Sequence, residues 1–213
     1  MTGGLLIVGA GGHGRVVADA AILQGAWSSI AFLDQNPELP AAQLGLPIIG
    51  ESASPAELLQ DYPHAVVAIG DSRRRLALMQ QMQDQGFSFA CVMHPSASVS
   101  AFCEVGAGSV VLAQAAINPG ATLGKGCIIN TGATVDHDCR LADGVHISPG
   151  AHLAGGVSVG RASWLGIGSS VRESVAIGEF VTVAAGAAVV DDIADHTTVG
   201  GVPAVPLRRR SSS

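Results

Sequence analysis

An aliphatic residue recurs at every sixth position through the second half of the chain. The series begins at Val99 and runs to Val189 without a gap or an insertion, which gives sixteen consecutive hexads over residues 99–194. A helix returns side chains to the same face about every 3.6 residues and a strand at every second residue, so neither explains the pattern. A six-residue period is typical of a parallel β-helix, in which each hexad forms one short strand and one corner. The sixteen aliphatic positions are Val99, Val105, Val111, Ile117, Leu123, Ile129, Val135, Leu141, Ile147, Leu153, Val159, Leu165, Val171, Ile177, Val183 and Val189.

The repeat resembles the left-handed β-helix of hexapeptide acyltransferases, and that resemblance implies three hexads in each coil. Sixteen hexads then form a little over five coils. The composition agrees with such a core, because 48% of the residues are hydrophobic, only 4% are aromatic and 28 are glycine. We expect long aliphatic side chains to fill the prism, small residues to lie beside them, and glycines to occupy corners whose backbone conformation other residues avoid.

The placement of the cysteines argues against disulfides. Cys103, Cys127 and Cys139 occupy the fifth position of their hexads, where small residues otherwise stand, and Cys91 precedes the repeat. With three hexads per coil, Cys103 and Cys139 are two coils apart, or roughly 9.5 Å at the usual strand spacing. The Cα atoms of a disulfide lie within about 7 Å. We therefore expect thiols that act as small core residues, which suits a reducing cytosol.

Charge and hydropathy exclude two classes of protein. The net charge is −6, the isoelectric point is about 5.5, and the basic run Arg208–Arg210 stands only at the end of the chain, so a nucleic-acid-binding protein is not expected. The mean hydropathy is +0.41, but polar residues interrupt every apolar run before it could span a membrane. The N-terminus also lacks the charged region of a signal peptide, and we expect a cytoplasmic protein. We expect the tail at residues 208–210 to be solvated; the alternative is contact with cofactor phosphates.

The first part of the chain has a different pattern, which predicts a nucleotide-binding unit. An apolar strand at residues 5–8 is followed by the loop Gly-Ala-Gly-Gly-His-Gly at residues 9–14 and by a helical segment at residues 15–23. A second strand at residues 29–33 ends in Asp34, where such a unit places an acid on a ribose. Free N–H groups at the start of the helix favour phosphate. The alternative is a tight turn in a docking domain.

The size of this first part limits its ligand. A further strand at residues 65–69 and a helix at residues 73–83 complete about ninety residues, roughly half of a full dinucleotide fold. The region has room for a mononucleotide rather than NAD, and a redox enzyme is disfavoured. Pro95 separates the two patterns. We predict a Rossmann-like α/β domain over residues 1–95 and a left-handed β-helix domain over residues 96–213.

Histidines inside the repeat are the candidate catalytic groups. The hexad at residues 135–140, Val-Asp-His-Asp-Cys-Arg, is the most charged of the sixteen, and His146 and His152 follow at the last positions of the next two hexads. An imidazole between carboxylates can act as a general base. The alternatives are an exposed charged turn and a zinc site. The histidine spacings of 9 and 6 residues lack the close pair expected of zinc ligands, and no cysteine is placed to replace one, so no metal is expected.

Three segments together resemble a bacterial sugar acetyltransferase family. They are the loop at residues 9–14, Asn130–Thr131, and Asp136–Asp138. The family includes N-acetyltransferases acting on nucleotide-activated 4-amino sugars in bacillosamine and perosamine synthesis, and related sialic-acid O-acetyltransferases. The likeness extends over nearly the full chain, and it implies an acetyl-CoA-dependent enzyme.

The resemblance implies roles for residues of the repeat. His137 would be the general base, and Asp138, where the family usually has glutamate, would orient it. Asp136 is an alternative partner because aspartate is shorter than glutamate. His146 and the backbone N–H of Gly155 would serve the acetyl-CoA side of the site, with the N–H meeting the thioester carbonyl. Acetyl-CoA would lie in a groove between neighbouring prisms of a homotrimer.

The same resemblance implies a substrate side. Asn130 matches an active-site asparagine, and Gly11, His13 and Asp34 would contact the nucleotide end of the sugar. The leading hypothesis is transfer of acetyl from acetyl-CoA to the 4-amino group of a UDP- or GDP-linked deoxy sugar. Two alternatives remain: O-acetylation of sialic acid or another surface sugar, and a non-catalytic trimeric scaffold that binds a nucleotide or a partner.

Overall fold

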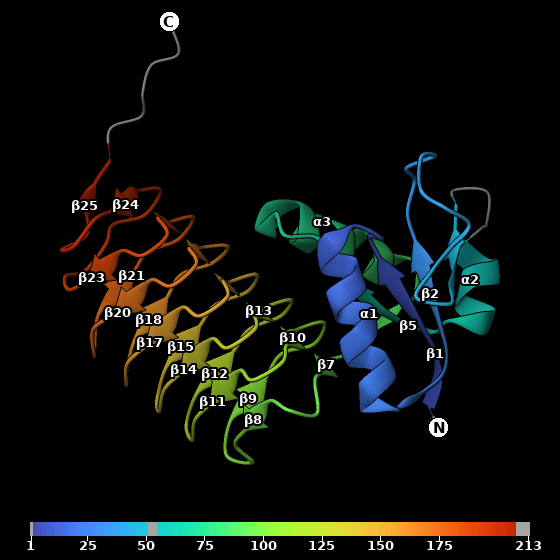
Figure 1. The fold of residues 1–213 in the computed structure, drawn as a ribbon, viewed down its shortest axis with the longest axis horizontal. Coiled ribbons are helices and arrows are strands. Elements are labelled where there is room, and N and C mark those ends of the chain that lie inside the picture. Colours follow the sequence, from blue (N-terminus) through green and yellow to red (C-terminus); the bar gives the residue numbers. More distant parts are fainter. Residues whose placement is uncertain (1, 51–54, 208–213) are drawn as a thin grey trace, which may run out of the picture.

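The computed structural model describes residues 2–50 and 55–207, and it contains an α/β part followed by a three-sided β-prism (Figure 1). The prism begins with β7 (Val92–Met93), which pairs with β10 (Val110–Val111) of the next coil. The predicted fold, a Rossmann-like unit before a hexapeptide-repeat β-helix, is confirmed.

The α/β part is a six-stranded sheet with helices on both faces. The strand order is β3-β4-β2-β1-β5-β6, and the central β1 runs parallel to β2 and β5. Side chains alternate along β1, so that Leu5 and Ile7 pack on the α1 side and Leu6 and Val8 on the α2 and α3 side. The elements are β1 (Thr2–Val8), α1 (Gly12–Gln24), β2 (Trp27–Leu33), β3 (Ala42–Gln43), β4 (Leu46–Ile49), α2 (Pro55–Asp61), β5 (His64–Val67), α3 (Ser72–Asp84) and β6 (Ser88–Phe89).

The glycine loop joins β1 to α1 in a tight turn. Gly9 has φ of +105°, a conformation that side-chain-bearing residues rarely adopt. A Cβ atom on Gly14 would overlap the carbonyl group of Gly9, so glycine is required for α1 to start this close to the strand. Gly11, by contrast, faces open space and leaves the loop accessible.

The prism consists of three parallel sheets whose strands are only a few residues long. Paired strands are 18 residues apart, as in Val110 opposite Ile128, which confirms three hexads per coil. The first sheet contains β7, β10, β13 (Ile128–Ile129), β16 (His146–Ile147), β19 (Trp164–Leu165), β22 (Thr182–Val183), β24 (Thr198–Gly200) and the antiparallel β25 (Val205–Pro206). The second contains β8 (Ser98–Val99), β11 (Ala116–Ile117), β14 (Thr134–Val135), β17 (His152–Leu153), β20 (Ser170–Val171) and β23 (Ala188–Val189), and the third contains β9 (Glu104–Val105), β12 (Thr122–Leu123), β15 (Arg140–Leu141), β18 (Ser158–Val159) and β21 (Ala176–Ile177).

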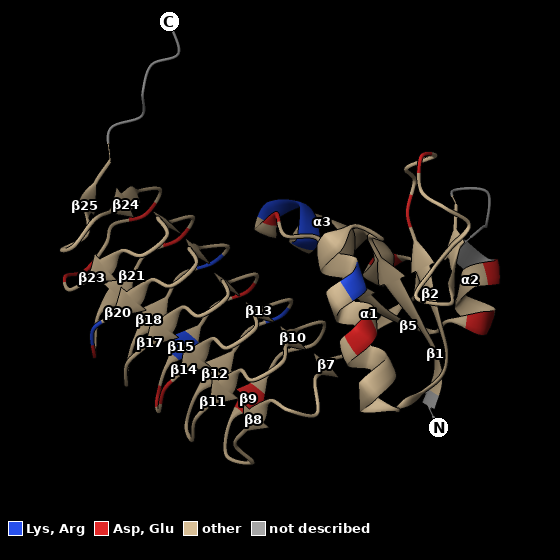
Figure 2. Cartoon of the chain, viewed as in Figure 1, with Lys and Arg blue, Asp and Glu red and all other residues tan. Residues whose placement is uncertain are grey.

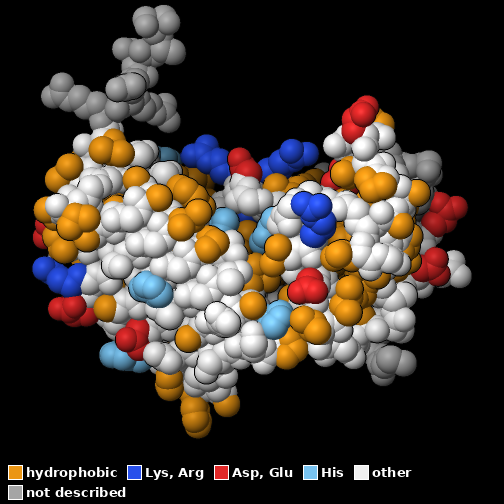
Figure 3. Space-filling view, viewed as in Figure 1, with side chains coloured by type: hydrophobic (Ala, Val, Ile, Leu, Met, Phe, Trp, Pro, Cys, Tyr) orange, Lys and Arg blue, Asp and Glu red, His pale blue; other side chains and the backbone are white. Residues whose placement is uncertain are grey.

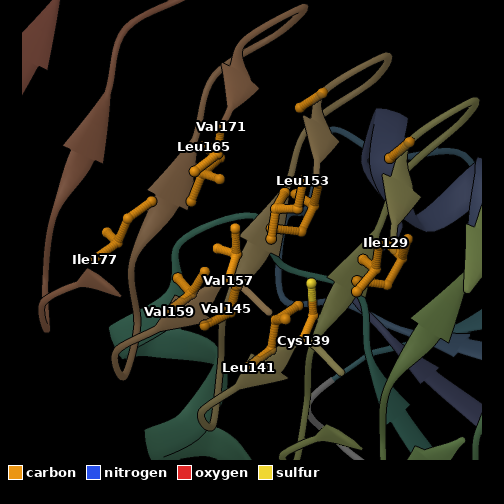
Figure 4. Close-up of a cluster of buried hydrophobic side chains, with 14 of the residues drawn as sticks. Ile129, Cys139, Leu141, Val145, Leu153, Val157, Val159, Leu165, Val171 and Ile177 are labelled. Carbon is orange, nitrogen blue, oxygen red and sulfur yellow. The ribbon is translucent and has the colours of Figure 1, made fainter. Parts of the chain in front are cut away.

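The aliphatic residue of each hexad points into the prism. Ile129, Leu141 and Leu153 belong to one continuous buried cluster, part of which Figure 4 shows. Cys127 and Cys139 are buried beside them, Cys91 and Cys103 are half-buried, and all four thiols are free. The prediction of unpaired cysteines is therefore confirmed. Burial raises the pKa of the Cys127 thiol to about 12, so it stays protonated in the core.

Two different contacts attach the α/β part to the prism. On one side, α1 packs over the first sheet, where Val17 and Ala21 share a buried cluster with Val110 and Ile128. On the other side, α3 lies along the prism edge where the third sheet passes into the first.

Glycines make room for α3 at that edge. Gly126 and Gly144 both have positive φ, and added Cβ atoms would lie 2.6 Å from Sδ of Met79 and 2.7 Å from Cδ1 of Leu76 respectively. Three residues of a helix rise about 4.5 Å, which nearly equals the ~4.8 Å between strands of neighbouring coils. Met79 accordingly meets the corners at Gly108 and Gly126, and Leu76, three residues earlier, meets those at Gly126 and Gly144.

Within the described residues, no helix has both the length and the apolar character needed to cross a membrane. Figure 2 shows charges of both signs scattered over the loops of the prism, while most of its strands are uncharged.

Candidate active site

The corner that follows β14 presents the candidate general base to solvent. The His137 side chain is 61% exposed, and its Nδ1 lies 2.8 Å from Oδ2 of Asp138. Asp138 has φ of +59°, and its N–H donates to the carbonyl of Pro119, which fixes the turn that aims the carboxylate at the ring. An ionised Asp138 selects the tautomer with hydrogen on Nδ1, so Nε2 carries a free lone pair.

Asp136 supports the same corner from the other side. Its Oδ1 accepts the backbone N–H of His137 at 2.7 Å and a side-chain N–H of Asn118 at 2.7 Å. These two bonds, that of Asn118 foremost, lower the pKa of Asp136. The hydrogen bond with Asp138, together with the negative charge of Asp136, raises the pKa of His137 above its usual 6.5. The imidazole is thus a stronger base than a free histidine.

Gly155 lies directly against the ring of His137. The two residues are one coil apart, and the N–H of Gly156 donates to the carbonyl of His137 at 2.9 Å. A Cβ atom on Gly155 would lie 2.5 Å from Cε1 and Nε2 of His137. Glycine therefore leaves the free nitrogen of the imidazole open. Asp138, His137 and Gly155, all predicted as site residues, come together in the structure.

A second group forms where the first prism sheet meets the glycine loop. His146, on β16, lies with its Nε2 3.2 Å from Nδ2 of Asn130, and its ring stacks on that of His13 with centroids 6.4 Å apart. The ring of Trp164 meets His146 edge-on at 6.4 Å. Figure 3 shows histidine side chains gathered along the hollow between the two parts of the molecule.

Both imidazoles of this second group are held neutral. Burial, reinforced by the positive charge of Arg75, lowers the pKa of His146 to about 3 and that of His13 to about 4. At neutral pH they serve as uncharged hydrogen-bonding groups. Nδ1 of His146 and Nε2 of His13 are shielded from solvent, and neither has a hydrogen-bond partner among the described residues.

The structure does not join the two groups within one chain. His137 lies at a corner after the second prism sheet, whereas His146 lies on the first sheet, half a coil away. Asp34 belongs to neither group. Its Oδ2 accepts the N–H of Ala10 at 2.7 Å and its Oδ1 accepts the N–H of Asn36, so it braces the glycine loop beside Gly11.

His152 is exposed and its Nδ1 lies 2.9 Å from Oγ1 of Thr134, apart from both groups. In the described part of the chain, no three His, Cys, Asp or Glu side chains are placed to hold a metal ion. The segment Arg208–Arg210 lies outside the described residues.

Clefts surround the start of α3. One of about 460 Å³ includes Gly70, Trp164 and Phe180 between the helix and the first prism sheet. Another of about 460 Å³ lies beside Gly9 and Asp34. A larger cleft of about 1000 Å³ follows α3 along the prism edge. The cleft beside Gly9 and Asp34 lies at the carboxyl ends of β1 and β2 and includes Ile69 after β5, at the place where the strand order reverses direction and α/β sheets bind ligands.

The sequence analysis missed three residues that shape these groups. Asn118 is 18 residues before Asp136, so the coil repeat could have placed it. Trp164 is likewise 18 residues after His146. Arg75 is one of three consecutive arginines, and no pattern in the sequence marks it as the buried one.

The chain is similar to proteins of known structure over nearly its whole length. Residues 4–82 match the family model of the PglD N-terminal domain. The acetyltransferase domain of PglB from Neisseria gonorrhoeae FA1090, also solved in complex with acetyl coenzyme A, is 42% identical with a TM-score of 0.90, covering 97% of this chain and 100% of that one. PerB from Caulobacter crescentus, in complex with CoA and GDP-perosamine, is 40% identical with a TM-score of 0.88, covering 98% and 99%.

More distant similarity extends the shared fold. WeeI from Acinetobacter baumannii AYE is 23% identical with a TM-score of 0.82, over 95% of this chain and 99% of that one. No curated protein sequence matches the chain.

Proposed function

The chain belongs to the family of sugar N-acetyltransferases that includes the PglB acetyltransferase domain and PerB, and we propose that it moves acetyl from acetyl-CoA to the 4-amino group of a UDP- or GDP-linked deoxy sugar. The observation that carries the proposal is the exposed imidazole of His137, oriented by Asp138 and left open at Nε2 by Gly155. A neutral base of raised pKa is what the removal of a proton from an attacking amine requires.

The reaction follows from that geometry. The amine nitrogen donates its lone pair to the thioester carbonyl carbon while Nε2 of His137 accepts a proton from the nitrogen. The N–H of Gly155 donates a hydrogen bond to the oxyanion that forms. When the carbon–sulfur bond breaks, the imidazolium returns its proton to the departing CoA sulfur, so base and protons balance at the end of each turnover. Asp138 stabilises the imidazolium in between.

The α/β part would hold the nucleotide. The cleft lined by Gly9 and Asp34 lies at the glycine loop that also contains Gly11 and His13, and the start of α1 has no side-chain cap on its first N–H groups, which favours a phosphate there. Asp34 already accepts the N–H of Ala10 through Oδ2. A ribose hydroxyl would therefore have to donate to a lone pair of the carboxylate that is still free. The size of this part favours one nucleoside diphosphate.

The site would be completed between copies of the chain. His137 and the Asn130–His146 group lie on different sides of one prism. A homotrimer, with the His137 corner of one copy beside the Asn130–His146 group of the next, would bring both groups to one groove for acetyl-CoA.

A direct assay tests the function. We expect the protein, mixed with acetyl-CoA and UDP- or GDP-linked 4-amino sugars, to release free CoA and form the N-acetylated product, followed by a thiol reagent and mass spectrometry. His137→Ala should reduce kcat/KM by about 10²- to 10⁴-fold. Lack of CoA release with every nucleotide-linked amino sugar would reject the reaction, and full activity of His137→Ala would reject the mechanism.

Two further arms separate the alternatives. If sialic acid or another free hydroxyl sugar, and not the amine, supports CoA release, the acceptor is a hydroxyl. If isothermal titration calorimetry detects no binding of acetyl-CoA, the chain is a scaffold rather than an enzyme.

A further inference from the structure

A buried arginine connects the α/β part to the prism. Arg75, on α3, is 1% exposed. Its Nε donates to the carbonyl of Gly126 at 2.7 Å, and its Nη2 donates to the carbonyl of Gly144 at 2.7 Å. Both acceptors are at prism corners of successive coils. The planar guanidinium spans them as a fork that a lysine could not reproduce.

The same guanidinium also holds the loop between β5 and α3. Its Nη1 donates to the carbonyls of Ile69 at 2.7 Å and Gly70 at 3.1 Å, and Nη2 lies 3.2 Å from Oγ of Ser72. No carboxylate among the described residues is paired with it. Burial lowers the pKa of Arg75 to about 10, so the group remains charged at neutral pH. A buried cation satisfied only by backbone carbonyls and one hydroxyl fixes the relative position of those backbones.

This loop borders the neutral imidazoles. Gly70 lies in the cleft with Trp164, whose ring touches His146. The charged group facing both His146 and His13 is Arg75, and each imidazole also faces the other's ring. Asp71 and Cys127 are the acidic groups near the guanidinium itself. Any shift of the loop would move the cleft wall beside Trp164, the ring that meets His146.

We propose that Arg75 is a positioning residue: by fixing the loop at residues 69–72 to two prism corners, it sets the place where the His13–His146 pair meets the nucleotide sugar. The proposal rests on the proposed function for its substrate. The hydrogen bonds by which Arg75 fixes this loop to the prism, called the Arg75 lock below, are present in the free protein. It acts through backbone carbonyls and through the charge that Arg75 presents to the imidazoles, and it does not touch the reacting atoms.

Arg75→Met tests the lock without substrate. Methionine retains much of the side-chain volume and removes the fork and the charge. We expect faster amide hydrogen exchange in residues 69–78, measured by mass spectrometry, and an upward shift of the His146 and His13 pKa values in an NMR titration. Arg172→Met, at an exposed position on the prism, is the matched control and should change neither.

Kinetics test the consequence. We expect Arg75→Met to lower kcat/KM for the nucleotide sugar by about 10- to 100-fold, mainly through KM. Arg75→Lys keeps the charge and should recover part of the loss. Because Arg75→Met leaves several buried carbonyls unpaired, Arg75→Lys, which lacks the fork, serves for the exchange measurement if the methionine variant fails to fold.

The outcomes are separable from failure of the proposed function. Unchanged exchange in residues 69–78 and unchanged imidazole titrations would overturn the lock, whether or not the protein transfers acetyl. Changed exchange and titrations with an unchanged KM for an active enzyme would overturn the positioning role. If no acetyl transfer is found at all, binding of the nucleotide sugar, measured by calorimetry, takes the place of KM.

Discussion

At the scale of single residues, the chemistry of the proposed site depends on what surrounds one imidazole. Asp138 fixes its tautomer, Asp136 and Asn118 fix its backbone, and Gly155 leaves its second nitrogen open. The ring is exposed, so its basicity comes from these neighbours rather than from burial. The other two histidines of the site have the opposite environment and stay neutral.

Asp138→Asn should move the acid limb of the pH profile. The base is active when neutral, so kcat/KM rises as pH increases through the pKa of His137, which the hydrogen bond with Asp138 raises above 6.5. Without that carboxylate the pKa falls, and we expect the acid limb to shift to lower pH while the plateau rate drops because the ring loses its orientation. The measurement is kcat/KM between pH 5 and 9.

Two controls accompany this profile. Asp136→Asn should shift the limb in the same direction by a smaller amount, since its charge is the second cause of the raised pKa. Asp191→Asn, on an exposed loop far along the prism, should leave the limb unchanged. An unshifted limb in Asp138→Asn would mean that another group titrates in the profile.

Gly155→Ala should reduce activity with little loss of stability. The new methyl group would lie 2.5 Å from Nε2 of His137, and the exposed ring can move away to relieve the overlap. We expect the displaced base to cost about 10²-fold in kcat, with a melting temperature close to that of the parent protein. Calorimetry and steady-state kinetics on the same preparation check both parts; wild-type kcat would show that the ring does not act from this position.

At the scale of elements, α3 fits along the prism corners because the rise of three helical residues nearly equals the spacing of neighbouring coils. The corner residues Gly126 and Gly144 are glycine because the helix side chains of Met79 and Leu76 occupy the space beside them. Two coils beyond Gly144, Phe180 occupies the equivalent corner position. The guanidinium carbon of Arg73 lies 4.4 Å from the centroid of its ring.

Gly144→Ala and Gly132→Ala form a matched pair that isolates this packing. Both glycines have positive φ, at +70° and +65°, so alanine brings similar backbone strain, about 1–2 kcal/mol, to each. A Cβ at position 144 would also meet Leu76, whereas position 132 faces open space. We expect Gly144→Ala to lower the free energy of unfolding by about 1–3 kcal/mol more than Gly132→Ala. Equal losses in urea denaturation would show that α3 does not pack tightly on the edge.

The part of the site that the repeat governs can be predicted from the sequence, although Asn118 was not. His137 and Gly155, and Asn118 and Asp136, are each 18 residues apart, so once the coil length is known their contact follows from arithmetic. The contact of His13 with His146 and the burial of Arg75 depend on how the α/β part docks on the prism. This docking depends on the packing of irregular surfaces, and no repeat in the sequence predicts which residues meet there.

At the scale of the whole molecule, the proposed site is divided between two sides of one prism, and a neighbouring copy would complete it. Such an arrangement makes activity depend on the assembly rather than on the fold of one chain.

Mixing two inactive variants tests the shared site. His137→Ala lacks the base, and the double variant Asn130→Ala, His146→Ala lacks the opposite group. If the site is shared, unfolding and refolding the two together, or expressing them together, should create hybrid trimers in which about one interface in three carries both intact groups. We expect activity to return in the mixture and not in either variant alone. A mixture that stays inactive, although mass spectrometry shows hybrid assemblies, would contradict the shared site.

The fit of α3 to the prism edge also constrains how this fold can vary in length. Met79 and Leu76 lie against the corners of neighbouring coils and Arg75 binds two of these coils, so a coil inserted or deleted between them would put these side chains against the wrong corners. Beyond Phe180 the helix no longer follows the edge. Additional coils are tolerable only there, and the prism can grow at its C-terminal end without disturbing the chemistry below.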